Sequence, residues 1–251
     1  MIRLNDIEYR YEESIALKPL TLDIKSGEHI VILGSNGSGK STLLRILAGL
    51  YYPTSGKYIL DNREINKSSI DKEFRRDVAI VFQNPESMLF NPTVYDEIAF
   101  GLREFEVDNI DTKVKDIANR FEIEHLLHRS PLLLSGGEKQ KVVIASMLVL
   151  NPKLLLLDEP TASMDPKTTG WFIDTLIELP QTIVTATHDL SLAYEISSRV
   201  IVLSQEHNII YDGDIEELLK DLDILIKANL IHKHKHKHKG FHHSHYHMHY
   251  K

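Results

Sequence analysis

Apolar and polar residues alternate at the start of the chain and give way to short, continuous apolar runs farther on. The alternation over residues 2–24 predicts half-buried antiparallel strands. Continuous runs at residues 29–33 and 154–157 are typical of strands buried on both faces of a sheet. Further strands are predicted at residues 77–82, 182–187 and 200–203.

Segments with helical periodicity separate these strands. Helices are predicted over residues 41–50, 138–150, 167–179 and 190–197. Strands that alternate with helices imply βαβ units and a mostly parallel sheet, and therefore an α/β fold. Residues 84–135 break the alternation, because they are helical and charged, which predicts a helical insertion.

The composition separates the body of the chain from its tail. The 251 residues are 42% hydrophobic and 26% charged, which excludes a mainly disordered or collagen-like chain. Residues 232–251 contain five Lys, nine of the fourteen His and no acid, so that residues 1–231 carry 24 basic and 36 acidic residues, a formal charge of −12. We therefore predict one domain over 1–231 and a flexible tail over 232–251. The acidic body argues against nucleic acid as a partner.

Three features that the chain lacks exclude some chemistry and a membrane-spanning segment. The absence of Cys excludes disulfides and thiolate metal sites. The first residues lack a signal-peptide pattern, and no apolar run approaches the ~20 residues that span a bilayer. If the protein works at a membrane, another chain is expected to cross it.

Residues 34–42 fit the phosphate-binding pattern G-x-x-x-x-G-K-[ST] and lie between a predicted strand and a predicted helix. Glycines let successive backbone N–H groups converge on a phosphate, and the helix start adds unpaired N–H groups and a positive dipole end. The alternative is an ordinary glycine-rich turn that opens a helix. The candidate ATP-binding residues are Gly34, Ser35, Asn36, Gly37, Ser38, Gly39, Lys40, Ser41 and Thr42. Lys40 is expected to bridge the β- and γ-phosphates, and Ser41 to ligate Mg²⁺.

Two carboxylates follow the apolar run at 154–157. Asp158 and Glu159 stand at a strand end, where ligands of open α/β sheets bind. We expect Asp158 to hold the Mg²⁺ shell and Glu159 to orient or deprotonate the attacking water. In isolation the pair could be a solvated strand end.

A third motif resembles the signature sequence of ATP-binding-cassette (ABC) ATPases. It comprises Ser135, Gly136, Gly137 and Glu138, preceded by Leu134. The family's other motifs follow in its order: Tyr11 matches the adenine-stacking aromatic, Gln83 the Q-loop, Asp165 the end of the D-loop, and His188 the switch histidine. Ser163 and Met164 depart from the Ala or Gly and the Leu that are common in the D-loop. We therefore expect ATPase activity, but a D-loop geometry that couples the two sites differently from the rest of the family.

The resemblance implies a P-loop ATPase with a RecA-like core sheet, an antiparallel N-terminal β-subdomain and a helical insertion. It implies catalytic roles for Lys40, Gln83, Glu159 and His188, with Mg²⁺ held through Ser41, Gln83 and Asp158. In the family, the signature of one subunit closes on ATP held by the other. A homodimer or a heterodimer with a related ATPase is therefore expected. Tyr9 lies two residues from Tyr11 on the same strand face, and either tyrosine could instead be core.

The region after Gln83 is similar to that of the energy-coupling-factor (ECF) branch, whose ATPases drive uptake of vitamins and transition-metal ions. In that branch a helix of a membrane scaffold docks beside the Q-loop. Met88, Leu89 and Phe90 are candidates for lining that groove, with burial inside the insertion as the alternative. The resemblance places the chain at the cytoplasmic face of the membrane, with scaffold and substrate-binding subunits as partners.

The tail is rich in potential metal ligands. Its histidines are His232, His234, His236, His238, His242, His243, His245, His247 and His249. Imidazole is a good ligand for Ni²⁺ and Co²⁺, and cobalt- and nickel-type ECF ATPases often end in such tails. A purification tag and a lipid-binding tail are the alternatives.

We therefore predict the ATP-hydrolysing subunit of a cobalt or nickel ECF importer. Three other functions stay open: an ECF ATPase for a vitamin, a soluble cassette ATPase acting on DNA or ribosomes, and a metal-storage protein.

Overall fold

The computed structural model describes residues 1–238 and 241–248, with side chains described over 1–231. Its N-terminal part is a four-stranded antiparallel sheet of order β2-β1-β4-β5. The strands are β1 (Ile2–Tyr11), β2 (Ser14–Ile24), β4 (Ser55–Leu60) and β5 (Arg63–Ile65). The antiparallel pair predicted over residues 2–24 is confirmed. The sequence pattern did not reveal β4 and β5.

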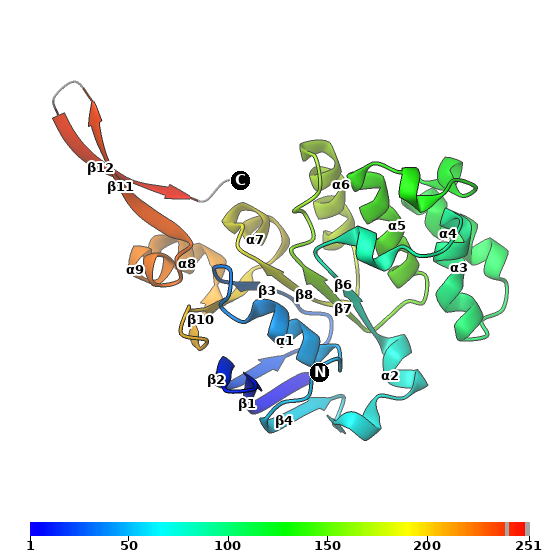
Figure 1. The fold of residues 1–251 in the computed structure, drawn as a ribbon, viewed down its shortest axis with the longest axis horizontal. Helices are drawn as coiled ribbons and strands as arrows, with labels where there is room; N and C mark the ends of the chain where they lie inside the picture. The colour runs from blue at the N-terminus through cyan, green and yellow to red at the C-terminus, as the bar shows by residue number, and fades with distance from the viewer. Residues whose placement is uncertain (239–240, 249–251) are drawn as a thin grey trace.

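The second sheet has the order β10-β9-β3-β8-β7-β6 and is parallel except for β10 at its edge. Its strands are β3 (His29–Leu33), β6 (Val78–Val81), β7 (Leu154–Asp158), β8 (Thr182–Thr187), β9 (Arg199–Leu203) and β10 (Ile209–Asp214). Every residue of β7 and β8 is buried, which is the pattern that continuous apolar runs predict. The fold is the predicted α/β architecture (Figure 1).

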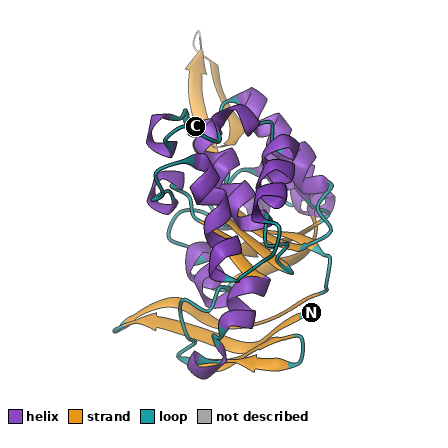
Figure 2. Ribbon diagram, turned by 90° about the vertical axis from the view of Figure 1, so that its right-hand side faces the viewer, coloured by secondary structure: helices purple, strands orange, loops and turns teal. Residues whose placement is uncertain are grey.

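Helices cover the core sheet and form the insertion (Figure 2). Around the sheet lie α1 (Lys40–Leu47), α2 (Lys72–Asp77), α5 (Gly136–Leu148), α6 (Pro166–Ile177), α7 (Leu190–Ile196), α8 (Ile215–Lys220) and α9 (Leu222–Lys227). The predicted insertion contains α3 (Val94–Glu104), α4 (Ile110–Arg120) and the 3₁₀ turns η2 (Pro85–Met88), η3 (Glu124–Leu126) and η4 (Pro131–Leu133); another such turn, η1 (Lys67–Ser69), follows β5. Helix α1 ends three residues before the predicted boundary, because Gly49 with φ of 67° turns the chain.

Alternate residues of the core strands belong to two hydrophobic clusters, one on each face of the core sheet. Leu155 and Leu157 pack with the insertion helices. Leu154 and Leu156 pack with α1 and the antiparallel sheet. Because successive side chains of a strand point to opposite faces, the core sheet is the layer that holds the two halves of the body together.

The tail forms two strands. Residues Ile231–His238 form β11 and Phe241–Met248 form β12, an antiparallel pair in which Ile231 opposes Met248 and His238 opposes Phe241. Pairing between two strands satisfies backbone N–H and C=O groups without a packed core. The hairpin extends away from the body (Figures 1 and 2).

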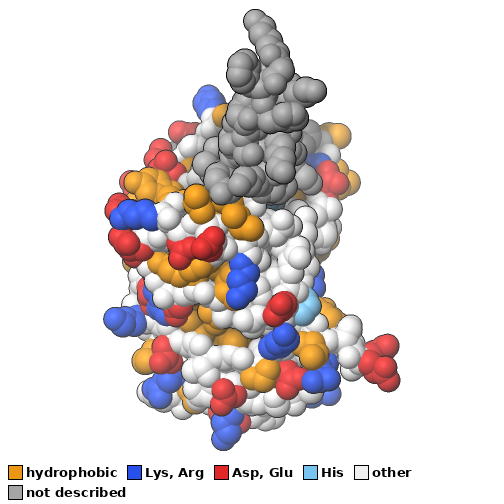
Figure 3. Space-filling model, turned by 90° about the vertical axis from the view of Figure 1, so that its left-hand side faces the viewer, with side chains coloured by type: hydrophobic (Ala, Val, Ile, Leu, Met, Phe, Trp, Pro, Cys, Tyr) orange, Lys and Arg blue, Asp and Glu red, His pale blue; other side chains and the backbone are white. Residues whose placement is uncertain are grey.

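The visible surface is chemically mixed. Figure 3 shows basic, acidic and hydrophobic side chains interspersed over one face of the body. Among the described residues, no helix combines the length and the apolar character that a bilayer span requires.

The buried hydroxyl of Tyr58 generates a stability prediction. Tyr58 on β4 is 1% exposed, and its hydroxyl donates a 3.0 Å hydrogen bond to the carbonyl of Leu47 at the end of α1. Tyr58→Phe keeps the ring but leaves that buried carbonyl without the bond, so we expect a loss of about 1–3 kcal/mol in unfolding free energy. Urea denaturation measures it, with the exposed Tyr52→Phe as control. Equal stability of the two variants would contradict the assigned role.

Candidate functional site

The loop between β3 and α1 adopts the backbone conformation that its glycines allow. Gly37 and Gly39 have φ of 84° and 106°, in the left-handed region. A Cβ at Gly39 would lie 2.5 Å from the carbonyl oxygen of Ala16 on β2. Gly39 precedes α1 without capping it through a side chain, so the first N–H groups of the helix remain available to an anion.

Lys40 lies at the centre of this loop. Its Nζ donates to the carbonyls of Gly34 at 2.7 Å and Ser35 at 3.2 Å, and stands 3.7 Å from Glu159 Oε1. Burial lowers the pKa of Lys40, while the negative charges of Glu159 and Asp158 oppose that shift. The ammonium group is therefore largely shielded from solvent, where its attraction for an added phosphate is stronger than in water.

Ser41 and Asp158 meet from two different motifs. The Ser41 hydroxyl donates a 3.0 Å hydrogen bond to Asp158 Oδ1 at the end of β7. Burial raises the pKa of Asp158, and the bond from Ser41 opposes this. Hydroxyl, carboxylate and amide oxygens are suitable ligands for Mg²⁺. Gln83 and Ser41 line one cavity, which is described below. These three residues therefore fit the predicted Mg²⁺ site.

Glu159 occupies a strained turn directly after β7. Its φ is 46°, a conformation that costs about 1 kcal/mol or more in a residue other than glycine. The carboxylate is held on both oxygens. His188 Nδ1 lies 2.9 Å from Oε1, and the Thr187 hydroxyl donates to Oε2 at 3.0 Å. The turn brings Glu159 and His188 together, although they are 29 positions apart.

A cavity of about 460 Å³ reaches Lys40, Ser41 and Glu159, while Asp158 and His188 do not line it. It is lined by Tyr11, Ser14, Ile15, Ala16, Asn36, Gly37, Gly39, Lys40, Ser41, Thr42, Gln83, Glu159 and His207. Most of the predicted ATP-binding residues face it, together with Glu159. The pattern analysis missed Ser14, Ile15, Ala16 and His207, because they come from β2 and from the turn before β10, which carry no motif.

The aromatic candidates are separated by the structure. Tyr11 is 41% exposed, and its hydroxyl lies 3.2 Å from Thr42 Oγ1. Tyr9 stacks on Tyr51, with ring centroids 5.2 Å apart, and Tyr11 packs edge-to-face on both. Of the two tyrosines of β1, Tyr11 is the one that lines the cavity, so we keep it as the candidate base-stacking residue.

The signature residues lie elsewhere, at the start of α5. Ser135 caps this helix by accepting from Glu138 N, while Glu138 Oε2 accepts from the backbone N–H of Ser135 at 2.8 Å. The bonds from Ser135 lower the pKa of Glu138. None of the four signature residues lines the cavity that holds Lys40. Within one copy of the chain, the two predicted phosphate sites are therefore separate.

Two contacts tie the signature to other motifs. Lys139 Nζ donates a 2.5 Å hydrogen bond to Glu86 in the η2 turn, which follows Gln83. On the other side, a Cβ at Gly137 would meet Thr168 Oγ1 at 2.8 Å. Thr168 belongs to the first turn of α6, which Asp165 caps by accepting from Thr168 N at 3.1 Å. The D-loop aspartate thus has a local structural role in this chain.

The surface after the Q-loop is partly apolar. Leu89 is buried at 7% exposure, whereas Phe90 is 67% exposed and packs edge-to-face on Phe100 with centroids 5.0 Å apart. Met88 is partly buried, and its sulfur accepts from Phe82 N at 3.3 Å. Of the three residues predicted for a docking groove, only Phe90 presents a largely exposed side chain.

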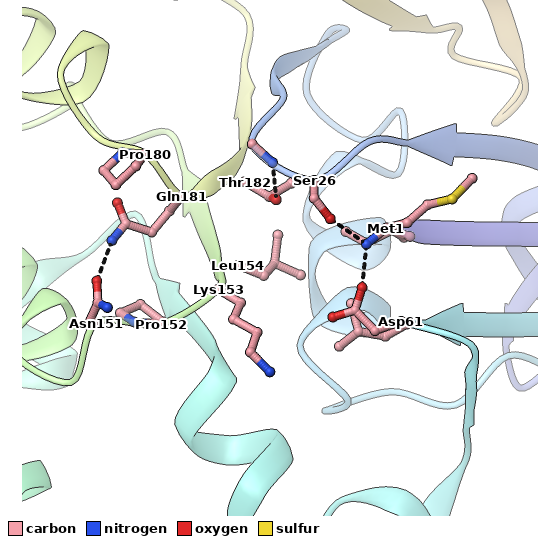
Figure 4. Close-up of a pocket in the computed structure, with 13 residues that line it drawn as sticks. Met1, Ser26, Asp61, Asn151, Pro152, Lys153, Leu154, Pro180, Gln181 and Thr182 are labelled. Atoms are coloured by element: carbon pink, nitrogen blue, oxygen red, sulfur yellow. Dashed lines mark hydrogen bonds and ion pairs between the residues drawn. The ribbon is translucent and has the colours of Figure 1, made fainter.

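The opposite edge of the core sheet has another cavity, of about 330 Å³, near the start of β7 and β8 (Figure 4). There the amino group of Met1 donates to Ser26 Oγ at 2.8 Å, and Gln181 donates to Asn151 at 2.9 Å. None of the predicted site residues lines it. The nine tail histidines lie outside the residues whose side chains the structure describes, and residues 1–231 contain no cluster of potential metal ligands.

Fold and site together define a P-loop ATPase, and comparison with known proteins gives the family. The model of the ABC transporter family matches residues 17–162. The chain is 38% identical to the energy-coupling factor transporter ATP-binding protein EcfA1 of Mycoplasma mobile, over 92% of this chain and 86% of that protein. The chain belongs to the ABC transporter family and is an ABC ATPase.

Two solved structures have the same fold. One is cbiO1 of Clostridium perfringens, part of the ABC transporter complex cbiONQ, with a TM-score of 0.80, 35% identity and coverage of 91% of this chain and 94% of that one. The other is the ATP-binding cassette MJ0796, a dimer in a post-hydrolysis state with ADP and Pi, with a TM-score of 0.76, 30% identity and coverage of 86% and 99%.

The position of Tyr11 generates a test of nucleotide binding. Tyr11→Ala removes the exposed ring beside the phosphate loop, and base–aromatic stacking contributes about 1–3 kcal/mol. We expect the KM for ATP to rise between roughly 5-fold and 100-fold at nearly constant kcat. Tyr11→Phe keeps the ring and should restore the KM. An unchanged KM in Tyr11→Ala would remove the assignment.

Proposed function

We propose that this chain is the ATP-hydrolysing subunit of an ECF-type importer for cobalt or nickel ions. The observation that carries the proposal is the meeting of Lys40, Asp158 and Glu159 at one edge of the core sheet. The similarity to cbiO1 and to EcfA1 supports the importer class. The apolar surface at Phe90 supports docking of a membrane-embedded scaffold, with the chain peripheral at the cytoplasmic face.

In the proposed reaction, Lys40 binds the β- and γ-phosphates, and exchanges its present carbonyl partners for phosphate oxygens. Ser41, Gln83 and Asp158 would hold Mg²⁺, which would supply positive charge to the phosphates when bound. Glu159 takes the proton of the attacking water, and His188 faces the γ-phosphate.

The signature supplies the reason for a dimer. Ser135 and the start of α5 form an anion site that lies apart from the nucleotide cavity of the same chain. A second subunit in head-to-tail arrangement would place its signature over this cavity, so that two ATP molecules lie between two subunits. The partner is a second copy or a related ATPase.

Replacing Glu159 tests the chemistry. Glu159→Gln keeps the size of the side chain but cannot accept the proton, so we expect ATP hydrolysis to fall by at least about 10²-fold. ATP binding should persist and trap a dimer, measured by light scattering with and without ATP. The exposed Glu178→Gln is the matched control. Normal turnover in Glu159→Gln would refute the role of this residue.

The transported ion is tested in cells. Loss of the chain should lower the accumulation of cobalt or nickel, measured by mass spectrometry, and the wild-type chain should restore it while Glu159→Gln should not. Unchanged levels of both metals, together with loss of a vitamin, would favour the vitamin branch. Co-purification with nucleic acid instead of membrane proteins would favour a soluble ATPase.

For the tail we propose binding of Ni²⁺ or Co²⁺ by its nine histidines. A chain that ends at Ile231 is compared with the full chain in ATPase assays and in titrations with Ni²⁺ and Co²⁺. It should keep ATP turnover but lose binding of the two ions in titration calorimetry. Binding to anionic vesicles without metal binding would favour the lipid alternative.

A further inference from the structure

Thr187 is the last residue of β8 and is not one of the predicted site residues. Its side chain is buried, and its hydroxyl donates a 3.0 Å hydrogen bond to Glu159 Oε2. The same hydroxyl oxygen accepts the backbone N–H of Asp189 at 3.1 Å. A hydroxyl has a single proton to donate, so the bond from Asp189 fixes its orientation and leaves the proton directed at Glu159.

The pairing of two parallel strands determines this contact. Asp158 on β7 stands opposite Ala186 on β8, and the N–H of Glu159 extends the ladder with a 2.9 Å bond to the carbonyl of Ala186. Thr187, the next residue, then lies beside the Glu159 side chain. Thr187 is the last residue of β8, and Glu159 directly follows β7 and is tied to β8 by this backbone bond.

The other partners of the carboxylate differ from Thr187. His188 and Lys40 both approach Oε1, at 2.9 and 3.7 Å. Both are also expected to turn toward the phosphates when ATP binds. Thr187 instead approaches Oε2 and is 1% exposed, whereas the His188 side chain is 31% exposed, so the bond from Thr187 to the carboxylate does not compete with the nucleotide.

We propose that Thr187 is a positioning residue, which holds Oε2 and thereby aims Oε1 of Glu159 at the attacking water. This inference rests on the proposed role of Glu159 as base. In that step the water oxygen bonds to the γ-phosphorus and the bond from this phosphorus to the β,γ-bridging oxygen breaks. The water proton passes to Glu159, and the products are ADP, phosphate and the released proton.

Three variants of β8 test the proposal. Thr187→Val removes the donor at nearly constant shape, and we expect kcat to fall roughly 10- to 100-fold, since a misplacement of about 1 Å can cost 10²-fold. The KM for ATP and the ATP-dependent dimer should not change. Thr187→Ser restores the hydroxyl and should recover kcat to within about threefold.

The matched control is Thr185→Val on the same strand. Thr185 is fully buried, and its hydroxyl has no hydrogen-bond partner among the described residues. Its removal should leave kcat unchanged. A wild-type kcat in Thr187→Val, an equal loss in Thr185→Val, or failure of Thr187→Ser to recover would each overturn the proposal.

A double variant distinguishes a positioning role of Thr187 from a role in folding. In Glu159→Gln, the added Thr187→Val change should leave the ATP-trapped dimer intact; loss of that dimer would assign Thr187 a structural role and overturn the inference. Normal turnover in Glu159→Gln alone would instead refute the proposed function. An inactive Glu159→Gln with a fully active Thr187→Val would refute only the inference.

Discussion

The register of three parallel strands is the constraint on which the rest of the structure depends. Strand β8 pairs with β3 on one side and with β7 on the other, and Leu33 stands opposite Thr187 while Asp158 stands opposite Ala186. The phosphate loop, the carboxylate pair and His188 begin where these strands end. A one-residue slip would exchange the two faces of a strand, and the clusters on both faces of the sheet oppose it.

The site also depends on burial. Lys40 and Glu159 are at most 9% exposed, and charges in such a position are costly unless they are paired. They are paired with each other, and Asp158, Ser41, Thr187 and His188 add hydrogen bonds around them. These polar contacts among motifs add to the hydrophobic packing of the sheet.

Much of this could be predicted from the sequence, because the relevant signals are local. The apolar runs of β3 and β7 and the glycines of the phosphate loop are contiguous, so their elements and order were predictable. Strands β4 and β5 were not predictable in this way. Strand β4 carries Gly56 and Lys57, which obscure its alternation, and one of its partners, β1, is distant in sequence. Thr187 and His207 could not be assigned from pattern alone, since their places beside Glu159 and the cavity arise from contacts between distant segments.

The ion pair between Lys139 and Glu86 has a consequence for how two subunits communicate. It joins the turn that follows Gln83 to the helix that begins with the signature. In the head-to-tail pair proposed above, Gln83 would face the nucleotide of its own subunit while that helix would face the nucleotide of the neighbour. Lys139 and Glu86 would then form a short connection between the segments at the two nucleotides.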